Sequence, residues 1–471
     1  MSHRLITAQT LPPDTTEPVA DLPVVVIGAG VSGLAAATFL QGSAPLLVLE
    51  AGARPGGNVQ SDVVEGRVLD RAANGWLDNE PAMGRLLERV GLAEQVVPAG
   101  PKAKVRWIYA DGALHPAPLS PPALLRSRLL GWGAKLRLLL EPLIGRGPRD
   151  GDETVGAFVR RRLGGAIVDR LVGPMVAGIY AADPDRLSLR AAFERLHQLE
   201  RTHRSLLLGA LKLRGSAGPR GHLETLPGGA GALTQHLADR LGADLLLETP
   251  ATSLERRQGR WRVHTPRGAV DASAVVLACP APVQARLVRG FDADAANALA
   301  DIPYAPVAVV ASAWKRGSWD QDPDGFGVLH ARGALGEIPG AEGVLGTLFT
   351  SCVFPDQGRK DEVLLRTILG GAIAPEVAER SDQELVARTR RALSAMLGPE
   401  RQGPELVRVY RHPRGIPQYA PGHLTRVAAV RAAQARHAGL YFIGNHLQGI
   451  GVKDCAREGE KVARQVLAFR G

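Results

Sequence analysis

Three glycines and one carboxylate have the types and spacing of a phosphate-binding turn. Gly28, Gly30 and Gly33 follow the β-branched run 24–27 and open an alanine-rich apolar segment, which predicts a buried parallel strand turning into a helix. Gly28 permits the tight turn, Gly30 lets a pyrophosphate approach the backbone, and Gly33 lets the helix lie close to the sheet. Glu50 ends the next apolar strand, where a carboxylate meets a ribose hydroxyl and favours an unphosphorylated ribose. An ordinary glycine turn is the alternative, but strand, helix, second strand and acid in one register favour nucleotide binding.

The residues after Glu50 narrow the nucleotide to FAD. Residues 51–58 read A-G-A-R-P-G-G-N, in which Arg54 can contact a phosphate and the glycines can pass close to a ligand. The pattern E-A-x-x-R-x-G-G after a second strand resembles the flavin amine oxidase and desaturase superfamily. This resemblance implies FAD as the cofactor. A solvated loop charge is the alternative role for Arg54.

The composition is that of a globular α/β protein with two or three domains. The chain has 471 residues, of which 45% are hydrophobic and 55 are glycine. Cys279, Cys352 and Cys455 are too few and too scattered for a disulfide framework or a C-x-x-C site, so a reducing, cytoplasmic location is expected. No apolar run reaches the roughly 18 to 20 residues that span a bilayer. Residues 1–21 lack the apolar core of a secretion signal and are expected to form a disordered tail.

The net charge of +10 predicts an acidic partner. Basic residues crowd the stretch 102–149, and the stretch 201–220 has basic residues but no acid. No nucleic-acid motif or series of aromatics accompanies them, so nucleic acid is not expected, and an anionic lipid surface or substrate fits better. Residues 122–144 combine leucines and Trp132 with cations, as in a helix that lies in a membrane interface. A core helix with snorkelling cations is the alternative.

The order of the expected elements indicates interleaved domains. Alternating strands over 307–314, 344–350 and 362–369 predict an antiparallel sheet on which a flat substrate can rest, and one helix is expected over 154–176. The expected fold class is α/β, with an FAD-binding Rossmann-like domain of the glutathione-reductase or amine-oxidase type, an antiparallel-sheet substrate domain and an inserted helical, membrane-associating domain. The expected FAD-binding segments are 22–80, 220–295 and 426–471, the substrate domain is 81–97 and 296–425, and the helical domain is 98–215.

Two stretches near the C-terminus resemble the signatures of one family. R-G-I-P-Q-Y-A-P-G-H (414–423) and G-N-H-L-Q-G-I-G-V-K-D-C (444–455) look like those of the flavin-dependent protoporphyrinogen oxidases, with supporting matches at 177–187, 200–206, 325–329 and 345–355. The resemblance implies the six-electron oxidation of protoporphyrinogen IX to protoporphyrin IX in haem synthesis, in which three O2 become three H2O2. It also implies peripheral association with the cytoplasmic face of a membrane, a ferrochelatase as downstream partner and a homodimer.

The same resemblance assigns substrate contacts. An arginine in the strand around 104–107 anchors a propionate, so Arg106 takes that role, with a surface arginine as the alternative. Gly178, in a glycine-led loop, lies near the flavin face, and Asn74 lies in a loop beneath the flavin where the family usually reads G-P-N-S-F. Ala72 and Ala73 replace the leading glycine and proline, which leaves the path of this loop open. The residues expected to sandwich the tetrapyrrole are Leu329, Leu345, Leu348 and Ile368.

The expected cofactor site combines these motifs, with the glycines from 444 to 451 at a helix start near the flavin pyrimidine edge. Its residues are Gly28, Gly30, Ser32, Gly33, Glu50, Ala51, Arg54, Gly56, Gly57, Asn58, Ala73, Asn74, Gly75, Trp76, Ala251, Gly444, Asn445, Gly449, Ile450, Gly451 and Val452.

No residue is assigned as a catalytic acid or base, because the flavin carries the chemistry. No metal is expected either, since His412, His423 and His446 lack the spacing of a tetrahedral site and are interpreted as structural or flavin-side hydrogen-bond partners.

Three other functions stay open. The same fold can oxidise coproporphyrinogen III to coproporphyrin III, whose four carboxylates need more cations. The number of basic residues near Arg106 does not separate the two substrates. A flavin amine oxidase or carotenoid desaturase is the second alternative. A flavin-loaded protein that binds a porphyrin or a membrane partner without catalysis is the third.

Overall fold

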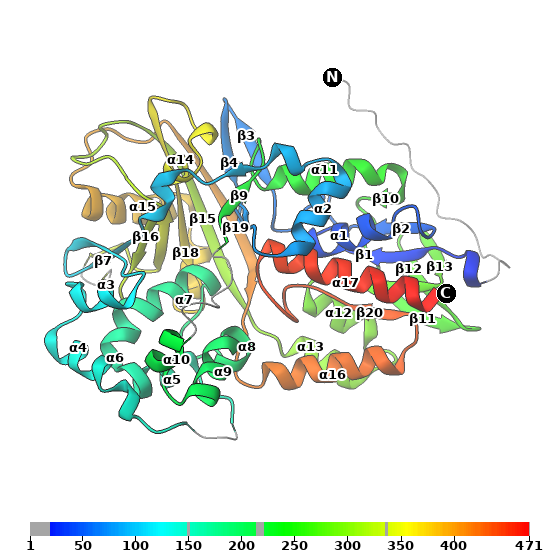
Figure 1. The fold of residues 1–471 in the computed structure, drawn as a ribbon. Coiled ribbons are helices and arrows are strands. Elements are labelled where there is room, and N and C mark those ends of the chain that lie inside the picture. The colour runs from blue at the N-terminus through cyan, green and yellow to red at the C-terminus, as the bar shows by residue number, and fades with distance from the viewer. Residues whose placement is uncertain (1–18, 148–150, 213–220, 335–337, 471) are drawn as a thin grey trace.

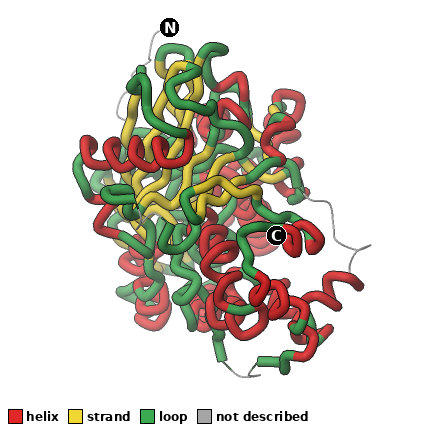
Figure 2. Tube along the Cα trace, turned by 90° about the vertical axis from the view of Figure 1, so that its left-hand side faces the viewer, coloured by secondary structure: helices red, strands yellow, loops and turns green. Residues whose placement is uncertain are grey.

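In the computed structural model the described residues are 19–147, 151–212, 221–334 and 338–470. The expected tail lies, up to residue 18, outside this part of the chain. Two large sheets organise the rest, and Figure 1 shows them side by side with the helical segment 98–215 beneath one of them. Figure 2 shows the strands gathered in the middle of the molecule and helices on the outside.

The first sheet is parallel and is built from three distant segments of the chain. Its strand order is β10-β2-β1-β14-β20, and neighbouring strands in this order are parallel. The FAD-domain topology expected from the glycine motif is therefore present. The strands are β1 (Val24–Ile27), β2 (Leu46–Leu49), β10 (Leu245–Leu246), β14 (Ala274–Leu277) and β20 (Leu440–Phe442).

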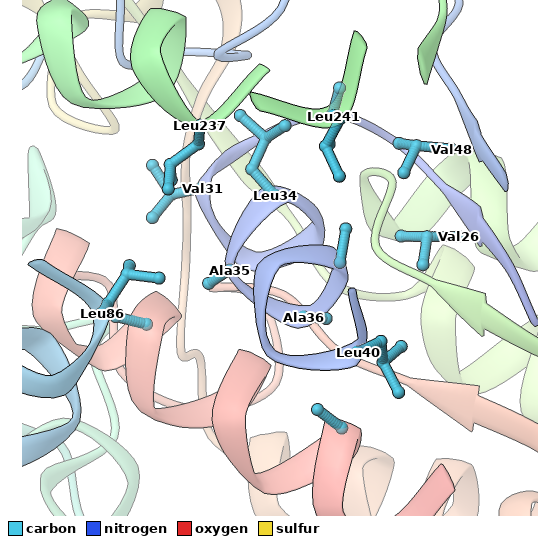
Figure 3. Packing of buried hydrophobic residues seen from close by; sticks show 14 of the residues in the cluster. Val26, Val31, Leu34, Ala35, Ala36, Leu40, Val48, Leu86, Leu237 and Leu241 are labelled. Carbon is cyan, nitrogen blue, oxygen red and sulfur yellow. The ribbon is translucent and has the colours of Figure 1, made fainter. Parts of the chain in front are cut away.

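β1 lies between two hydrophobic cores, because its side chains point alternately to its two faces. Val24 and Val26 face one core, shown in Figure 3, while Val25 and Ile27 face the other. The first core contains α1 (Val31–Leu40), α2 (Pro81–Val90), α11 (Gly231–Leu241) and α17 (Val452–Arg470). The second contains α12 (Ala281–Val288), α13 (Ala293–Ala300), α16 (His423–Arg436) and the small sheet of β11 (Ser253–Arg257), β12 (Arg260–Thr265) and β13 (Gly268–Ala272).

The second sheet has seven strands in the order β19-β15-β18-β17-β16-β7-β8. It is antiparallel except for the β16–β7 pair, which confirms the antiparallel floor expected from the alternating strands. α15 (Asp382–Leu397) covers its outer face. The strands are β7 (Trp107–Ala110), β8 (Ala113–Pro116), β15 (Tyr304–Lys315), β16 (Gly327–His330), β17 (Val344–Leu348), β18 (Glu362–Gly370) and β19 (Leu406–Pro417), and α14 (Thr350–Val353) follows β17.

Short strands link the two large sheets. They are the hairpin of β3 (Ser61–Val64) and β4 (Arg67–Asp70), and the small sheet of β5 (Trp76–Leu77), β9 (Leu223–Thr225) and β6 (Val97–Pro98). Arg67 of β4 is buried and pairs with Glu362 of β18, which joins the hairpin to the seven-stranded sheet.

The segment 98–215, expected as a helical domain, combines helices with two strands. It supplies β7 and β8 to the seven-stranded sheet, and the expected helix over 122–144 is broken because Leu129 and Leu130 turn inward to be buried. The helix expected over 154–176 is also broken, since Gly164 adopts a φ of +94°. The helices are η3 (Pro101–Lys104), α3 (Pro121–Arg126), α4 (Trp132–Leu139), η4 (Glu141–Leu143), α5 (Val155–Leu163), α6 (Gly165–Ile167), the π-helix η5 (Val168–Val172), α7 (Gly173–Tyr180), α8 (Leu189–Ala192), α9 (Glu194–His203) and α10 (Leu206–Lys212).

Candidate functional site

The glycine motif lies at the carboxyl edge of the parallel sheet. Gly28 follows β1 with a φ of +109°, which favours glycine. A Cβ on Gly33 would lie 1.9 Å from the Gly28 carbonyl oxygen, so α1 can approach the turn only with glycine there. A Cβ on Gly30 would meet nothing within 4 Å. The first turn of α1 therefore faces open space on the side where a phosphate would bind.

Glu50 lies beside this turn, at the carboxyl end of β2. Its carboxylate accepts one hydrogen bond from the Ala29 amide at 2.7 Å and one from the Gly52 amide at 2.8 Å. Each oxygen of an ionised carboxylate has a further acceptor position. The side chain is thus oriented by the backbone and still able to accept a ribose hydroxyl. The Thr249 amide donates to the Glu50 carbonyl, which brings the segment leading to Ala251 to the same edge.

Arg54 is exposed and forms an ion pair with Asp62 at 3.1 Å. Asp62 also accepts hydrogen bonds from Arg71. Burial raises the pKa of Asp62, but the bonds from Arg71 and Arg54 outweigh it and lower that pKa to about 2. The contact of Arg54 with a phosphate stays a prediction, since this position already gives its guanidinium an anionic partner.

The loop 71–76 leaves the β3–β4 hairpin and runs between the two sheets. Trp76 is buried and its indole N–H donates to Glu224 at 3.2 Å, while the Ala72 carbonyl accepts a hydrogen bond from Arg366 of β18. Asn58 donates to the Gly415 carbonyl at 3.1 Å. The side-chain nitrogen of Asn74 is buried without a hydrogen-bond partner among the described residues.

The third segment reaches the same edge from β20. α17 begins at Val452, and the Gly451 amide donates to Asp454 at 3.2 Å. The Tyr419 hydroxyl donates to the Asn445 carbonyl at 2.6 Å, so the two signature stretches are in contact. The predicted cofactor residues of the three segments thus follow strands that are neighbours in one sheet.

Two of the three histidines considered in the sequence lie beneath this segment. His423 stacks on Tyr419 with ring centroids 4.1 Å apart, and its Nε2 lies 3.4 Å from the Leu447 carbonyl. Burial lowers the pKa of His423 to about 4 and that of His446 to about 3, so both rings are neutral. The described residues contain no group of His, Cys, Asp and Glu side chains arranged to hold a metal ion.

The apolar residues expected to hold the substrate lie on the face of the seven-stranded sheet opposite α15, which we call the inner face. Leu345 and Ile368 pack together with Ala177 of α7. Leu348 belongs to a neighbouring cluster with Phe326. The four positions, Leu329, Leu345, Leu348 and Ile368, are brought together by β16, β17 and β18, which are adjacent strands.

α7 lies over part of the inner face. Gly178 belongs to this helix, whereas the sequence had indicated a glycine-led loop. A Cβ on Gly178 would lie 2.6 Å from a methyl carbon of Leu329, and the next residue, Ile179, keeps 48% of its surface exposed although its neighbours are apolar.

Arg106 lies in the extended link just before β7. It is exposed, and its guanidinium carbon is 5.0 Å from the centroid of the Phe326 ring. No carboxylate pairs with Arg106 in the part of the chain that the structure describes. The side chain is therefore held by an aromatic ring next to Leu348 and keeps its charge available.

A family comparison identifies this arrangement. The model of the flavin-containing amine oxidoreductases matches residues 31–467. The chain belongs to the flavin-containing amine oxidoreductases. FAD is accordingly its cofactor.

Relatives of this oxidoreductase cover nearly its whole length. The chain is 31% identical to the chloroplastic protoporphyrinogen oxidase of Nicotiana tabacum, over 96% of this chain and 86% of that protein. It is 32% identical to the coproporphyrinogen III oxidase of Propionibacterium freudenreichii, over 94% of this chain and 90% of that protein. Among solved structures, a "putative protoporphyrinogen oxidase" from Exiguobacterium matches with a TM-score of 0.81 and 25% identity, covering 95% of this chain and 99% of that one.

Two observations indicate that the residues of this oxidoreductase fit FAD. Gly30 leaves open space at the positive end of α1, where the pyrophosphate of the dinucleotide would bind. Asn74 offers a buried amide nitrogen that has no acceptor in the part of the chain that the structure describes, as expected where a flavin ring with carbonyl and ring-nitrogen acceptors would lie. The other individual contacts of the predicted cofactor residues stay predictions.

Two features of the oxidoreductase site were missed in the sequence. Arg366 is a buried cation on the inner face, and its signal in the sequence was a charged residue within the otherwise uncharged run 363–370. Ile179 is exposed beside Gly178, and no local signal marked it, because its exposure depends on how α7 lies over the sheet.

Proposed function

We propose that this chain oxidises a porphyrinogen to the corresponding porphyrin, with protoporphyrinogen IX as the preferred substrate. The observation that carries the proposal is the apolar inner face of the seven-stranded sheet, which has Arg106 at one side and the loop 71–76 at another. A flat apolar macrocycle with anionic substituents is complementary to such a surface. The names of the relatives, which include protoporphyrinogen and coproporphyrinogen III oxidases, support this substrate class.

The chain's own residues mainly bind and orient the macrocycle. When bound, FAD supplies the two-electron acceptor for a carbon–hydrogen bond of a methylene bridge. Leu329 and Ile368 would contact the macrocycle through apolar surface and exclude water, and Arg106 would hold a propionate. Over the full reaction, the porphyrinogen loses six electrons and six protons, which three O2 take up to become three H2O2.

Turnover of the two porphyrinogens tests the proposal. Purified protein is given protoporphyrinogen IX or coproporphyrinogen III, and porphyrin fluorescence is followed. The expected result is conversion of protoporphyrinogen IX with the higher kcat/KM. A large preference for coproporphyrinogen III would reassign the main substrate, and conversion of neither would overturn the function.

We also propose that the surface formed by α4 and η4 contacts an anionic membrane. Trp132 is 86% exposed and Leu143 is 76% exposed, and Leu136, Leu139 and Leu140 are exposed between them. Lys135 lies 5.0 Å from the centroid of the Trp132 ring, so a cation accompanies the apolar side chains. Their exposure supports the interfacial interpretation over a core helix. None of the helices in the described ranges is both long and apolar enough to cross a bilayer.

The remaining partners are proposals that rest on the same resemblance. Release of the porphyrin to a ferrochelatase and pairing of two copies into a homodimer are expected for a cytoplasmic, membrane-associated enzyme of this kind.

A further inference from the structure

Arg366 is a buried cation in the middle of β18. Its side chain is 7% exposed, and its neighbours in register are Ala311 on β15 and Leu348 on β17. Alternation along the strand places Arg366 on the same face as Ile368, which is the inner face. It lies between the part of that face covered by the β3–β4 hairpin and the part that α7 covers.

The guanidinium has few partners. One nitrogen donates to the Ala72 carbonyl, and Nε is buried without a hydrogen-bond partner in the described ranges. None of the ion pairs recorded among these residues includes Arg366. Since an arginine keeps its proton in proteins, this is a charge held in the interior without a carboxylate in contact.

The charge of Asp70 acts on the guanidinium of Arg366, but the hydrogen bonds of Asp70 are made with other residues. One oxygen of Asp70 accepts from the Ser61 hydroxyl at 2.6 Å and from the Ala230 amide at 3.0 Å, and the other is buried without a hydrogen-bond partner among the described residues. Asp70 and Arg366 line the same cavity of about 10 Å³, which has room for about one water molecule. Burial raises the pKa of Asp70 and lowers that of Arg366, so neither charge is fully compensated by the other.

A buried charge without a contacting partner is unfavourable in the free protein. Such a group is well suited to a ligand that brings an anion. The protein accepts this unfavourable free energy beside Leu348 and Ile368, which belong to the apolar surface proposed above to bind a tetrapyrrole.

Arg366 and Arg106 lie in one transverse row of the sheet. Arg366 pairs with Leu348, Leu348 pairs with Gly327, and Arg106 directly precedes the residue that pairs with Val328. The backbones of the two residues are therefore three strands apart, roughly 14 Å at about 4.8 Å per strand. A leucine and a glycine occupy the row between them. One cation is exposed at the side of the face and the other is buried at its inner end.

The two candidate porphyrinogens differ in the edges of the macrocycle that carry their carboxylates. Protoporphyrinogen IX carries its two propionates on neighbouring pyrroles, so both leave the macrocycle at one edge. Coproporphyrinogen III carries one propionate on each of its four pyrroles, so a carboxylate also leaves at the opposite edge. Coproporphyrinogen III can therefore place carboxylates at Arg106 and Arg366 from opposite edges, whereas protoporphyrinogen IX offers both of its carboxylates at one edge.

We infer that Arg366 is the inner carboxylate-binding residue of this face, and that it extends the substrates of the chain to a tetrapyrrole with four carboxylates, such as coproporphyrinogen III. This inference rests on the proposed function. The guanidinium, oriented by the Ala72 carbonyl, receives the carboxylate that lies across the macrocycle from the one at Arg106.

Binding of oxidised porphyrins to FAD-loaded protein tests the inference without turnover. Dissociation constants for coproporphyrin III and protoporphyrin IX are measured by fluorescence titration for wild type, Arg366→Gln and Arg366→Lys. We expect Arg366→Gln to weaken coproporphyrin III about tenfold or more and protoporphyrin IX less than twofold. Arg366→Lys keeps the charge and is expected to restore part of the affinity. The tetramethyl ester of coproporphyrin III, which lacks the charges, is expected to bind all three proteins alike.

Arg408→Gln is the matched control. Arg408 pairs in register with Ala311, as Arg366 does, but it is exposed, and its change is expected to leave both affinities unaltered. Flavin absorbance per protein and the thermal midpoint report folding of each variant. If Arg366→Gln does not fold, Arg366→Met, which removes the buried charge, carries the same expectation.

The outcomes separate the two proposals. Equal weakening of both porphyrins, or no change for coproporphyrin III, would overturn the role of Arg366 and leave the proposed function standing. Wild-type protein that binds FAD but neither porphyrin would overturn the proposed function itself.

Discussion

Gly178 and Leu329 are packed so closely that a Cβ on the glycine would lie 2.6 Å from a methyl carbon of the leucine. α7 therefore approaches β16 as nearly as the side chains allow. This contact sets the space over the inner face of the seven-stranded sheet, where we place the substrate.

Gly178→Ala is expected to lower kcat/KM for a porphyrinogen about tenfold, because Leu329 must then move toward the space that the macrocycle occupies. Steady-state kinetics measure this, and Leu329→Val in the same chain is expected to restore part of the activity. Gly84→Ala is the control, since a Cβ at this helical glycine would meet nothing within 4 Å. Equal activity of Gly178→Ala and wild type would remove α7 from the substrate site.

Arg106→Ala is expected to raise KM about tenfold and to change kcat little, because it removes an attraction made equally in the bound substrate and the transition state. Arg106→Lys should raise KM less than Arg106→Ala does, since Lys also carries a charge but stacks less well on Phe326. Arg126→Ala, in α3, serves as the control. An unchanged KM would make Arg106 an ordinary surface arginine.

His330 makes the stability of the fold depend on pH. Both ring nitrogens are buried without partners in the described part of the chain, and burial lowers the pKa of His330 to about 3. In the unfolded chain the ring takes up a proton near pH 6.5, so the folded state loses stability as the pH falls below that value.

His330→Phe is expected to reduce the loss of unfolding free energy between pH 7.5 and pH 5.5 by about 1 kcal/mol. Urea unfolding at the two pH values measures this. His222→Phe is the control, because the His222 ring is exposed. A pH dependence that is the same in His330→Phe and wild type would mean that the buried ring is protonated in the folded protein.

The surface of α4 and η4 is expected to hold the protein on anionic vesicles at low salt and to release part of it at high salt. Flotation with vesicles of neutral and anionic lipid measures this. Trp132→Ser with Leu143→Ser should abolish retention, whereas Val63→Ser with Ile373→Ser, which removes exposed apolar groups elsewhere, should not. Wild-type protein that never floats would contradict membrane contact.

The parallel sheet and its glycine turn could be predicted because their signals are local. The run 24–27, the three glycines and Glu50 lie close together in the chain and each has a direct backbone consequence. The alternating strands of the second sheet were predicted for the same reason.

The helical segment and parts of the site could not be predicted in this way. Leu129 and Leu130 interrupt a helical pattern because they are buried in two different cores, which depends on tertiary packing. Arg366 is placed opposite Arg106 by the order β18-β17-β16-β7, and this order joins strands from distant parts of the chain. No spacing along the sequence encodes that proximity.

One spectrum tests the central claim most directly. Purified protein is expected to show the two absorbance bands of bound flavin and to lose them when protoporphyrinogen IX is added without oxygen. Protein that is colourless and takes up no FAD, or bound flavin that no porphyrinogen bleaches, would contradict the account.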